Sequence, residues 1–165
     1  MRKWMLGLWL PLPILLGWLH GMLQGWLMQS AWWFLPYYVL PIILAVVWFD
    51  AGARCAKCGL SLPVALAIFH ALGFLSVALC AWQFRLPEAK QIRLLADASQ
   101  VFFQTFGVFS ARIGSLLVPG KVPNAPFGEL LLATQCVALI EMGGLFSLAF
   151  LSGTRKMKLV EEQDV

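Results

Sequence analysis

The stretch LPVALAIFHALGFLSVALCAW, residues 62–82, decides the fold of this chain. It contains no Asp, Glu, Lys or Arg, and its length matches the roughly 20 residues that a helix needs to cross the hydrocarbon core of a bilayer. Three more apolar runs occupy residues 4–28, 32–49 and 130–151. The sequence therefore predicts an all-α, polytopic membrane bundle of four transmembrane helices, with a long outer loop at residues 83–129.

The composition supports lipid as the solvent of the whole chain. Of the 165 residues, 61% are hydrophobic and 12% are charged, with a mean hydropathy of +0.80, whereas a soluble domain is about half apolar and about a quarter charged. Residues 1–152 are expected to form a single bundle and residues 153–165 a cytoplasmic tail. The net charge is +4, but the basic residues are scattered and form no nucleic-acid-binding stripe. We expect the lipid bilayer, and no nucleic acid, as a partner.

Two sets of residues predict the orientation in the membrane. The positive-inside rule makes the side that carries most Lys and Arg cytoplasmic. Three short segments that a four-helix topology places on one side contain Arg2, Lys3, Arg54, Lys57, Arg155, Lys156 and Lys158. The opposite interface gathers Trp26, Trp32, Trp33, Tyr37, Tyr38 and Trp82, because aromatic rings favour that depth. We expect both termini to be cytoplasmic and the membrane to be a bacterial inner membrane.

The outer loop 83–129 is too long for a simple turn and has an apolar pattern of its own. From Ile92 onward, large apolar residues recur at helical spacing, at Leu95, Phe102, Phe106, Phe109, Ile113 and Leu117. An interfacial helix, a re-entrant segment and a fifth span are the three candidates. The fifth span is disfavoured because it would move the basic tail outside and place Arg112 in hydrocarbon. The sequence leaves the depth of residues 99–118 open.

Small residues mark two helix faces. Gly17, Gly21 and Gly25 are four residues apart and line one face of the first predicted helix. Gly143 and Gly144 give the fourth helix another face where a second helix can approach closely. In lipid, such faces favour helix packing through van der Waals contact. The packing is either within the chain or against a second subunit, and the motif does not distinguish the two.

Glu141 lies near the middle of the fourth predicted helix, where a carboxylate needs a partner, water or a proton. His70 lies at a similar depth in the third helix, and His20 and Gln24 adjoin the glycine face of the first. We therefore predict an intramembrane polar cluster of these four residues. Its functional form is an ion or proton site. Its structural form, which we favour, is a protonated Glu141 that is hydrogen-bonded between helices.

Cys55 and Cys58 form a CxxC motif in the predicted cytoplasmic loop. The spacing is that of half a zinc site or of a redox dithiol. A structural zinc needs four ligands, and Cys80 and Cys136 fall a membrane thickness away, so a partner would have to supply the rest. A thiol oxidase needs its cysteines in the oxidising compartment, but this motif is predicted to face the reducing cytosol. Two free loop thiols are the favoured interpretation.

The run VFFQT at residues 101–105 is followed, after Pro119, by FGELL at residues 127–131 and a glycine-bearing apolar helix. Over residues 61–152, this order resembles the outer helix, pore loop and inner helix of pore-loop cation channels. The resemblance implies an oligomeric pore with an outward-facing loop. At the filter position, residues 108–112 read VFSAR in place of TVGYG. An arginine there repels cations, so potassium selectivity does not carry over.

The sequence contains no recognisable catalytic or cofactor motif. HExxH, GxSxG and Walker loops do not occur in it. The leading hypothesis is a non-enzymatic inner-membrane subunit that packs against copies of itself or other membrane proteins. The alternatives are an oligomeric pore or ion-transport subunit in which Glu141 lines the path, and a thiol-dependent membrane redox protein.

Overall fold

The computed structural model describes residue 7, residues 9–118 and residues 127–163, with Glu88 and residues 156–163 described by their backbone alone. Every regular element in these parts of the chain is a helix, so the predicted all-α class is confirmed. Arg2 and Lys3, with the beginning of the predicted span 4–28, lie outside the described residues.

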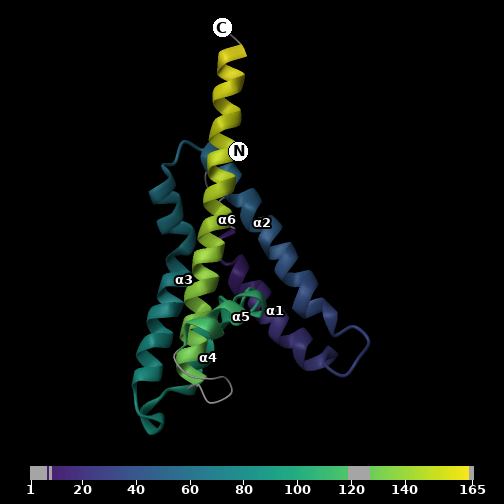
Figure 1. Ribbon diagram of the computed structural model, residues 1–165, viewed down its shortest axis with the longest axis vertical. Helices are drawn as coiled ribbons and strands as arrows, with labels where there is room; N and C mark the ends of the chain where they lie inside the picture. The colour runs from purple at the N-terminus through teal and green to yellow at the C-terminus, as the bar shows by residue number, and fades with distance from the viewer. Residues whose placement is uncertain (1–6, 8, 119–126, 164–165) are drawn as a thin grey trace.

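Three helices have the length and apolar composition needed to cross a membrane, at Leu35–Lys57, Leu62–Arg85 and Phe127–Arg155. They indicate an integral membrane protein. The first joins the π-helical turn η2 (Leu35–Val39) to α2 (Leu40–Lys57). The second is α3 (Leu62–Arg85), and the third is most of α6 (Phe127–Gln163). Figure 1 shows α3 beside α6, with α2 leaving α6 at an angle.

Prolines mark where these helices begin. Pro13 stands in the first turn of α1 (Leu12–Leu27) and Pro63 in the first turn of α3, where a missing N–H leaves no helical hydrogen bond unmade. Pro41 lies in the first turn of α2, which η2 precedes without a break. There the Leu40 N–H bonds the Leu35 carbonyl in the wider π-helical turn, and such turns accommodate local interruptions without ending a helix.

Two helices extend beyond the predicted ends of their spans. α2 continues past residue 49 to Lys57, so Cys55 lies in its last turn and Cys58 at its C-cap. The CxxC motif is therefore at a helix end, and its prediction as part of a loop is corrected. α6 continues through most of the predicted tail, as far as Gln163.

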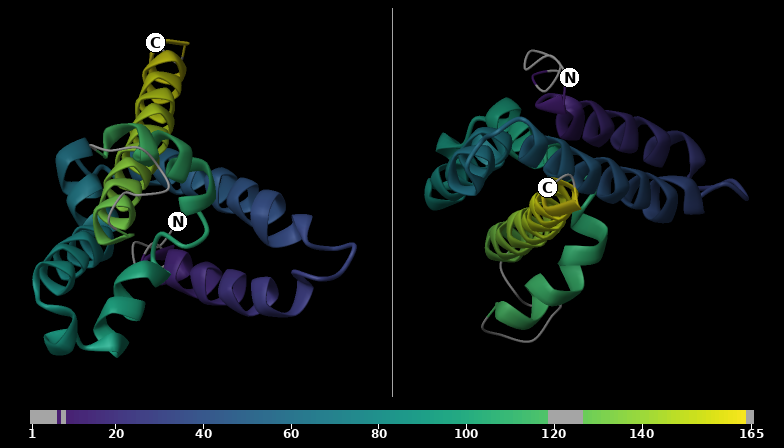
Figure 2. Two further views of the ribbon diagram at one scale, coloured as in Figure 1. Left: turned by 60° about the horizontal axis from the view of Figure 1, so that its bottom comes forward. Right: turned by 90° about the horizontal axis from the view of Figure 1, so that it is seen from above.

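α1 (Leu12–Leu27) is 16 residues long and folds back beside α2, to which it connects through residues 28–34. Figure 2 shows the two helices as one hairpin. The Arg54 guanidinium carbon lies 5.6 Å from the centre of the Trp9 ring, a cation–π contact between the chain just before α1 and the last turn of α2. α1 by itself is shorter than a typical crossing helix. The fourth span therefore stays a prediction.

The described part of the predicted outer loop folds into two short helices. After η3 (Glu88–Lys90), α4 (Arg93–Val101) packs against α3. A turn at residues 102–106 then leads into α5 (Gly107–Leu117), which lies across α6 in Figures 1 and 2. The helical spacing that begins at Ile92 is thus divided between two elements.

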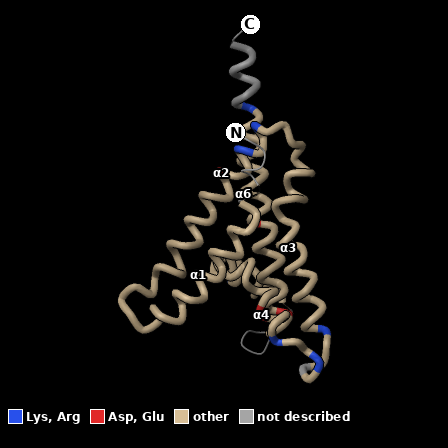
Figure 3. Tube along the Cα trace, turned by 180° about the vertical axis from the view of Figure 1, so that it is seen from behind, with Lys and Arg blue, Asp and Glu red and all other residues tan. Residues whose placement is uncertain are grey.

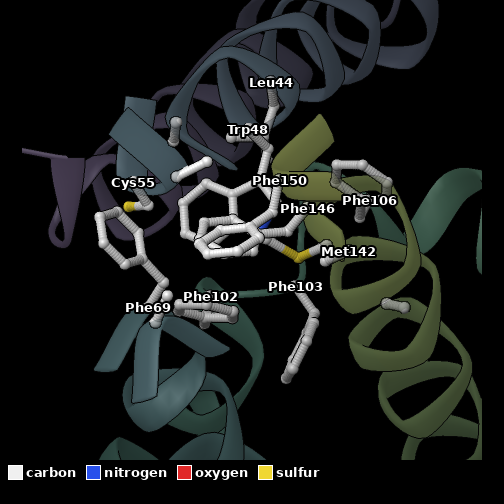
Figure 4. Close-up of a cluster of buried hydrophobic side chains, with 14 residues drawn as sticks. Leu44, Trp48, Cys55, Phe69, Phe102, Phe103, Phe106, Met142, Phe146 and Phe150 are labelled. Carbon is white, nitrogen blue, oxygen red and sulfur yellow. The ribbon is translucent and has the colours of Figure 1, made fainter. Parts of the chain in front are cut away.

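The turn at residues 102–106 inserts into the aromatic core that α2, α3 and α6 surround. Figure 4 shows this core as a contiguous group of buried side chains. Its largest members are Trp48, Phe69, Phe102, Phe103, Phe106, Met142, Phe146 and Phe150. The ring centres of Phe69 and Phe146 are 5.2 Å apart, and those of Trp48 and Phe69 are 5.9 Å apart. Phenylalanines of the outer loop therefore belong to the same core as the long helices.

Phe102 shows how far this insertion reaches. Its ring lies against Gly73, where an added Cβ would be 2.9 Å from Phe102 Cε1. Gly73 is the twelfth of the 24 residues of α3. The outer segment therefore penetrates to about half the length of α3.

Lys and Arg residues gather toward the two ends of the longest dimension of the molecule (Figure 3). The last turn of α2 contains Arg54 and Lys57, and the last turn of α3 contains Arg85. The long helices thus have cations near their ends and apolar residues between them, which is the distribution expected of helices that cross lipid.

Candidate functional site

Two buried glutamines hold α4 by its backbone. Gln83 Oε1, in the last turn of α3, accepts a hydrogen bond of 2.8 Å from the Ile92 N–H at the start of α4. Gln135 Nε2, on α6, donates a hydrogen bond of 3.0 Å to the Ser99 carbonyl near the end of α4. Gln83 is 0% exposed and Gln135 1%. We refer to Gln83 and Gln135 as the amide clamp.

The short length of α4 explains the amide clamp. The first N–H groups and the last carbonyls of a helix have no partner within that helix, and the interior of the bundle supplies no water to bind them. α4 has nine residues, so these groups are a large share of its backbone. Each one that is buried without a partner costs about 1–3 kcal/mol. The amide clamp therefore lowers the free energy of holding α4 inside the bundle.

Sequence reasoning missed the amide clamp. Both glutamines interrupt apolar runs, and a buried amide in such a run needs a partner, which is the signal that identifies them. Each also keeps unused hydrogen-bonding capacity: Gln83 Nε2 and Gln135 Oε1 have no partner among the described residues. The signal could have pointed to Gln83 and Gln135, but not to α4 as the element that they bind.

A side-chain hydrogen bond between Ser110 and Glu141 links α5 to α6. Ser110 Oγ donates a hydrogen bond of 2.6 Å to Glu141 Oε2. Ser110 is buried and Glu141 is half-buried. The predicted need of Glu141 for a partner is therefore met by a hydroxyl of the outer segment, and the pair links the inserted helix α5 to the long helix α6.

His70 has partners other than Glu141. Its Nε2 lies 3.2 Å from Trp48 Nε1, and its Nδ1 lies 3.1 Å from the Leu66 carbonyl oxygen. The indole N–H can only donate and the carbonyl can only accept. His70 therefore accepts at Nε2 and donates at Nδ1, which is the arrangement of a neutral imidazole. It joins α3 to α2 within the aromatic core.

His20 and Gln24 meet around a third residue, Tyr37. Gln24 Nε2 donates a hydrogen bond of 2.9 Å to the Tyr37 hydroxyl oxygen. The His20 ring packs edge-on against the Tyr37 ring at 5.9 Å, and His20 Nδ1 has no partner among the described residues. The four residues of the predicted polar cluster are thus divided among three sets of partners, in place of one shared site.

The glycine face of α1 is used mostly within the chain. A Cβ at Gly17 would lie 1.8 Å from the Val101 carbonyl oxygen, and one at Gly21 would lie 3.0 Å from Gln104 Nε2. Gly25 has nothing within 4 Å of the same position. Gly17 and Gly21 therefore let α1 approach the end of α4 and the turn that follows it.

Sequence reasoning missed two further close approaches at glycine. A Cβ at Gly52 of α2 would lie 2.4 Å from the Phe146 carbonyl oxygen of α6. A Cβ at Gly114 of α5 would lie 2.9 Å from the Thr134 backbone nitrogen, also of α6. Neither glycine has a second glycine four residues away, so the glycine spacing did not reveal them.

Gly143 and Gly144 line an apolar groove between α3 and α6. The groove has a volume of about 450 Å³ and is lined by Leu66, His70, Phe74, Leu139, Ile140, Gly143, Gly144 and Ser147. An added Cβ at Gly143 would lie 3.9 Å from His70 Nε2, whereas Gly144 is exposed with nothing within 4 Å. We call this the α3–α6 groove.

The CxxC motif does not gather a metal site among the described residues. Cys55 is buried in the aromatic core, and Cys58 is half-buried at the C-cap of α2. No group of three or more His, Cys, Asp or Glu side chains in the described parts of the chain could hold a metal ion. Cys55 therefore acts as a small apolar side chain in packing.

The segment at the filter position of the channel resemblance lies in a helix. Residues 108–112 fall within α5, so their carbonyl groups take part in helical geometry. Arg112 is exposed on that helix.

The described residues therefore offer three features with functional meaning. These are the inserted α4–α5 segment with its amide clamp, the Ser110–Glu141 pair and the open α3–α6 groove. The groove can accept an apolar element from outside, and the pair is the polar group that an ion or proton could reach. No protein-family model, curated protein or solved structure matches this chain.

Proposed function

We propose that this protein is a non-enzymatic integral membrane subunit that binds a helix of another subunit in the α3–α6 groove. The observation that carries the proposal is Gly144, a glycine with nothing within 4 Å of its Cβ position, in a groove that the described chain leaves open. The partner is a copy of this chain or another membrane protein. Gly17 and Gly21 of α1 already pack against residues of the same chain, so they are not available for contact with a partner helix.

Small residues on one wall of the α3–α6 groove favour packing of a helix over filling by lipid. Helices in lipid associate through close packing at small residues, because burial of apolar surface drives little association there. Gly143, Gly144 and Ser147 line one wall of the groove, and Phe74 and Leu66 line the other. A partner helix with a small-residue face can fit between these walls more closely than mobile acyl chains can.

The proposed placement in the membrane has α1, α2, α3 and α6 as four spans, with both termini in the cytoplasm of a bacterial cell. The contact between Trp9 and Arg54 supports a fourth span because it pairs the two ends of the α1–α2 hairpin. α4 and α5 then form a re-entrant segment that enters from the outer side. The position of Phe102 against Gly73, halfway along α3, supports re-entry over a surface position.

A photo-crosslinking amino acid at position 144 tests the proposed interface in intact membranes. We expect it to form an adduct with a protein, whose mass identifies a second copy or another subunit. The control is the same amino acid at Leu116, which is 83% exposed on α5 and is expected to react with lipid alone. Lipid adducts alone at both positions would contradict the proposal.

The second candidate function is ion or proton transport, and the Ser110–Glu141 pair favours it. A carboxylate hydrogen-bonded at 2.6 Å to a hydroxyl of an inserted segment can exchange a proton with a path that the segment opens. Liposomes that contain the protein and a pH-sensitive dye should then show proton flux. Glu141→Gln should abolish the flux, and Glu129→Gln, at an exposed position of the same helix, should leave it unchanged. Equal flux in wild type, Glu141→Gln and empty liposomes would exclude this function.

A further inference from the structure

Three aromatic rings surround a small pocket at the bend between α1 and η2. The pocket has a volume of about 280 Å³ and is lined by Met28, Trp33, Tyr37 and Tyr38. We propose that it is a binding site for a quaternary ammonium group. We call it the aromatic cage, and it is separate from the α3–α6 groove that carries the proposed function.

The rings are inclined to one another, as the walls of such a site must be. The ring centres of Trp33 and Tyr37 are 6.3 Å apart with an angle of 58° between planes. Those of Trp33 and Tyr38 are 6.1 Å apart with an angle of 66°. A cation is attracted to the face of an aromatic ring within about 6 Å of its centre. A cation in the angle between these planes can therefore interact with more than one ring.

Contacts outside the cage hold the Tyr37 wall and the bend before Trp33. The Tyr37 hydroxyl accepts the hydrogen bond from Gln24, and its ring packs against His20, so both ends of that side chain are held. Ser30 holds the bend before Trp33, because its Oγ donates to the Leu27 carbonyl and accepts from the Trp32 N–H. One wall of the cage and the bend that presents Trp33 are therefore in place before a ligand arrives, which lowers the entropy lost on binding.

The charges around the cage select the kind of cation. Residues 12–49 contain no Asp, Glu, Lys or Arg, so the end of the hairpin that holds the cage offers no carboxylate to replace the water around a metal ion or a primary ammonium. Removing a strongly hydrated charge from water without such a partner is costly. A quaternary ammonium has no N–H groups to satisfy and presents methyl groups to the rings, so aromatic faces are sufficient to bind it.

Two sources can supply this group. The cage lies at the beginning of the membrane-length helix Leu35–Lys57, at the opposite end from the cations of its last turn. Such a position gives access to the choline group of a phospholipid and also to a free quaternary ammonium solute. The recognition chemistry is the same for both.

Saturation-transfer NMR on the full-length protein in detergent micelles without choline tests the site, with tetramethylammonium as the probe. We expect saturable transfer to its methyl groups. Trp33→Leu and Tyr38→Leu should each weaken binding by about tenfold, whereas Tyr38→Phe should retain it because the ring remains. Trp26→Leu is the matched control, since Trp26 is 76% exposed outside the cage.

A neutral ligand of the same shape separates charge recognition from apolar contact. The neutral carbon analogue of choline, 3,3-dimethylbutanol, should bind at least about tenfold more weakly than choline. Equal binding of the two would overturn the proposal, as would equal binding of tetramethylammonium by wild type, Trp33→Leu and Tyr38→Leu.

Native mass spectrometry then distinguishes the two sources. Wild-type protein taken from bilayers of phosphatidylcholine and phosphatidylglycerol should retain phosphatidylcholine more than Trp33→Leu does if lipid is the ligand. Binding of the free cation without this difference assigns the cage to a solute. If the protein neither binds the free cation nor retains phosphatidylcholine, the proposal is overturned.

Discussion

Gln83 and Gln135 stabilise a helix to which neither of them belongs. Their amides bond the backbone at both ends of α4, where an apolar side chain would leave an N–H and a carbonyl unpaired. Glu141 acts similarly through Ser110 of α5. Gln83, Gln135 and Glu141 thus fix the inserted segment. The need for a partner is conspicuous in the sequence at Glu141, which has a full charge, whereas the amides of Gln83 and Gln135 give a weaker signal.

Replacing one member of the amide clamp should destabilise the protein. Gln83→Met removes the acceptor for the Ile92 N–H, and Gln135→Met removes the donor to the Ser99 carbonyl. Each change should lower the free energy of unfolding by about 1–3 kcal/mol, because a buried backbone group loses its partner. Thermal unfolding of the purified protein in detergent measures this as a fall in Tm.

Gln100→Met is the control for the clamp variants. Gln100 Nε2 bonds the Ala96 carbonyl within its own helix and is only half-buried, so its loss should have little effect. A Tm loss for Gln100→Met as large as for the clamp variants would mean that α4 is not held by Gln83 and Gln135 in particular.

The hydrogen bond between Trp48 and His70 should contribute less than the packing of the indole. Trp48→Phe keeps an aromatic ring against Phe69 and Phe146 but removes the N–H donor, which should cost about 1 kcal/mol. Trp48→Ala also leaves a cavity and should cost about 3–5 kcal/mol. Chemical unfolding of both variants in micelles compares them, and equal losses would show that the hydrogen bond dominates.

Helix pairs in this molecule approach most closely at glycines. Gly17 brings α1 against the end of α4, Gly52 brings α2 against α6, and Gly114 brings α5 against α6. At each of the three, an added Cβ would be under 3.0 Å from a backbone atom of the neighbouring segment, which cannot move as a flexible side chain can. The packing of the elements therefore depends on the absence of a methyl group at a few positions.

Gly17→Ala should lower the thermal stability of the protein in detergent. Its Cβ would lie 1.8 Å from the Val101 carbonyl oxygen, so α1 and α4 would have to separate. Gly25→Ala on the same helix meets nothing within 4 Å and should leave Tm unchanged or slightly raised, because alanine is the better helix former. If both substitutions have the same effect on Tm, the contact between α1 and α4 does not contribute to stability.

The long helices could be predicted from the sequence, and the fold of the outer loop could not. Apolar runs predicted residues 62–82 and 130–151 as helical, because run length directly reflects the thickness of lipid. The break at residues 102–106 has no such signal: its phenylalanines continue the helical spacing, and the turn is stabilised by burial against distant residues such as Gly73.

The candidate site was predictable only in part, for a related reason. Glu141 is conspicuous in an apolar run, but its partner Ser110 is 31 positions away, and only the fold of α5 brings them together. His70 was assigned to the same cluster by its depth. Depth alone does not specify which side of a helix a residue occupies, and His70 lies instead against Trp48.

The molecule as a whole consists of the α1–α2 hairpin, the α3–α6 pair and a segment that inserts between them. The hairpin and the pair are inclined to each other. In Figure 1 the hairpin and the pair diverge from the end where α2 meets α6. The α4–α5 segment occupies the angle, with contacts to α1, α3 and α6. The inserted segment therefore packs against helices of both units, while α2 and α6 also contact each other directly at Gly52 and Phe146.

That the α4–α5 segment returns to the side of the membrane from which it enters is the central claim, and labelling of single cysteines from one side of the membrane tests it most directly. In a cysteine-free background, Ala89→Cys precedes the segment, Glu129→Cys follows it and Ser61→Cys lies in the α2–α3 connection; all three positions are exposed. A membrane-impermeant thiol reagent added to intact cells should label positions 89 and 129 and should reach position 61 only after permeabilisation. Labelling of 89 and 129 from opposite sides would contradict re-entry, because the segment would then cross the membrane.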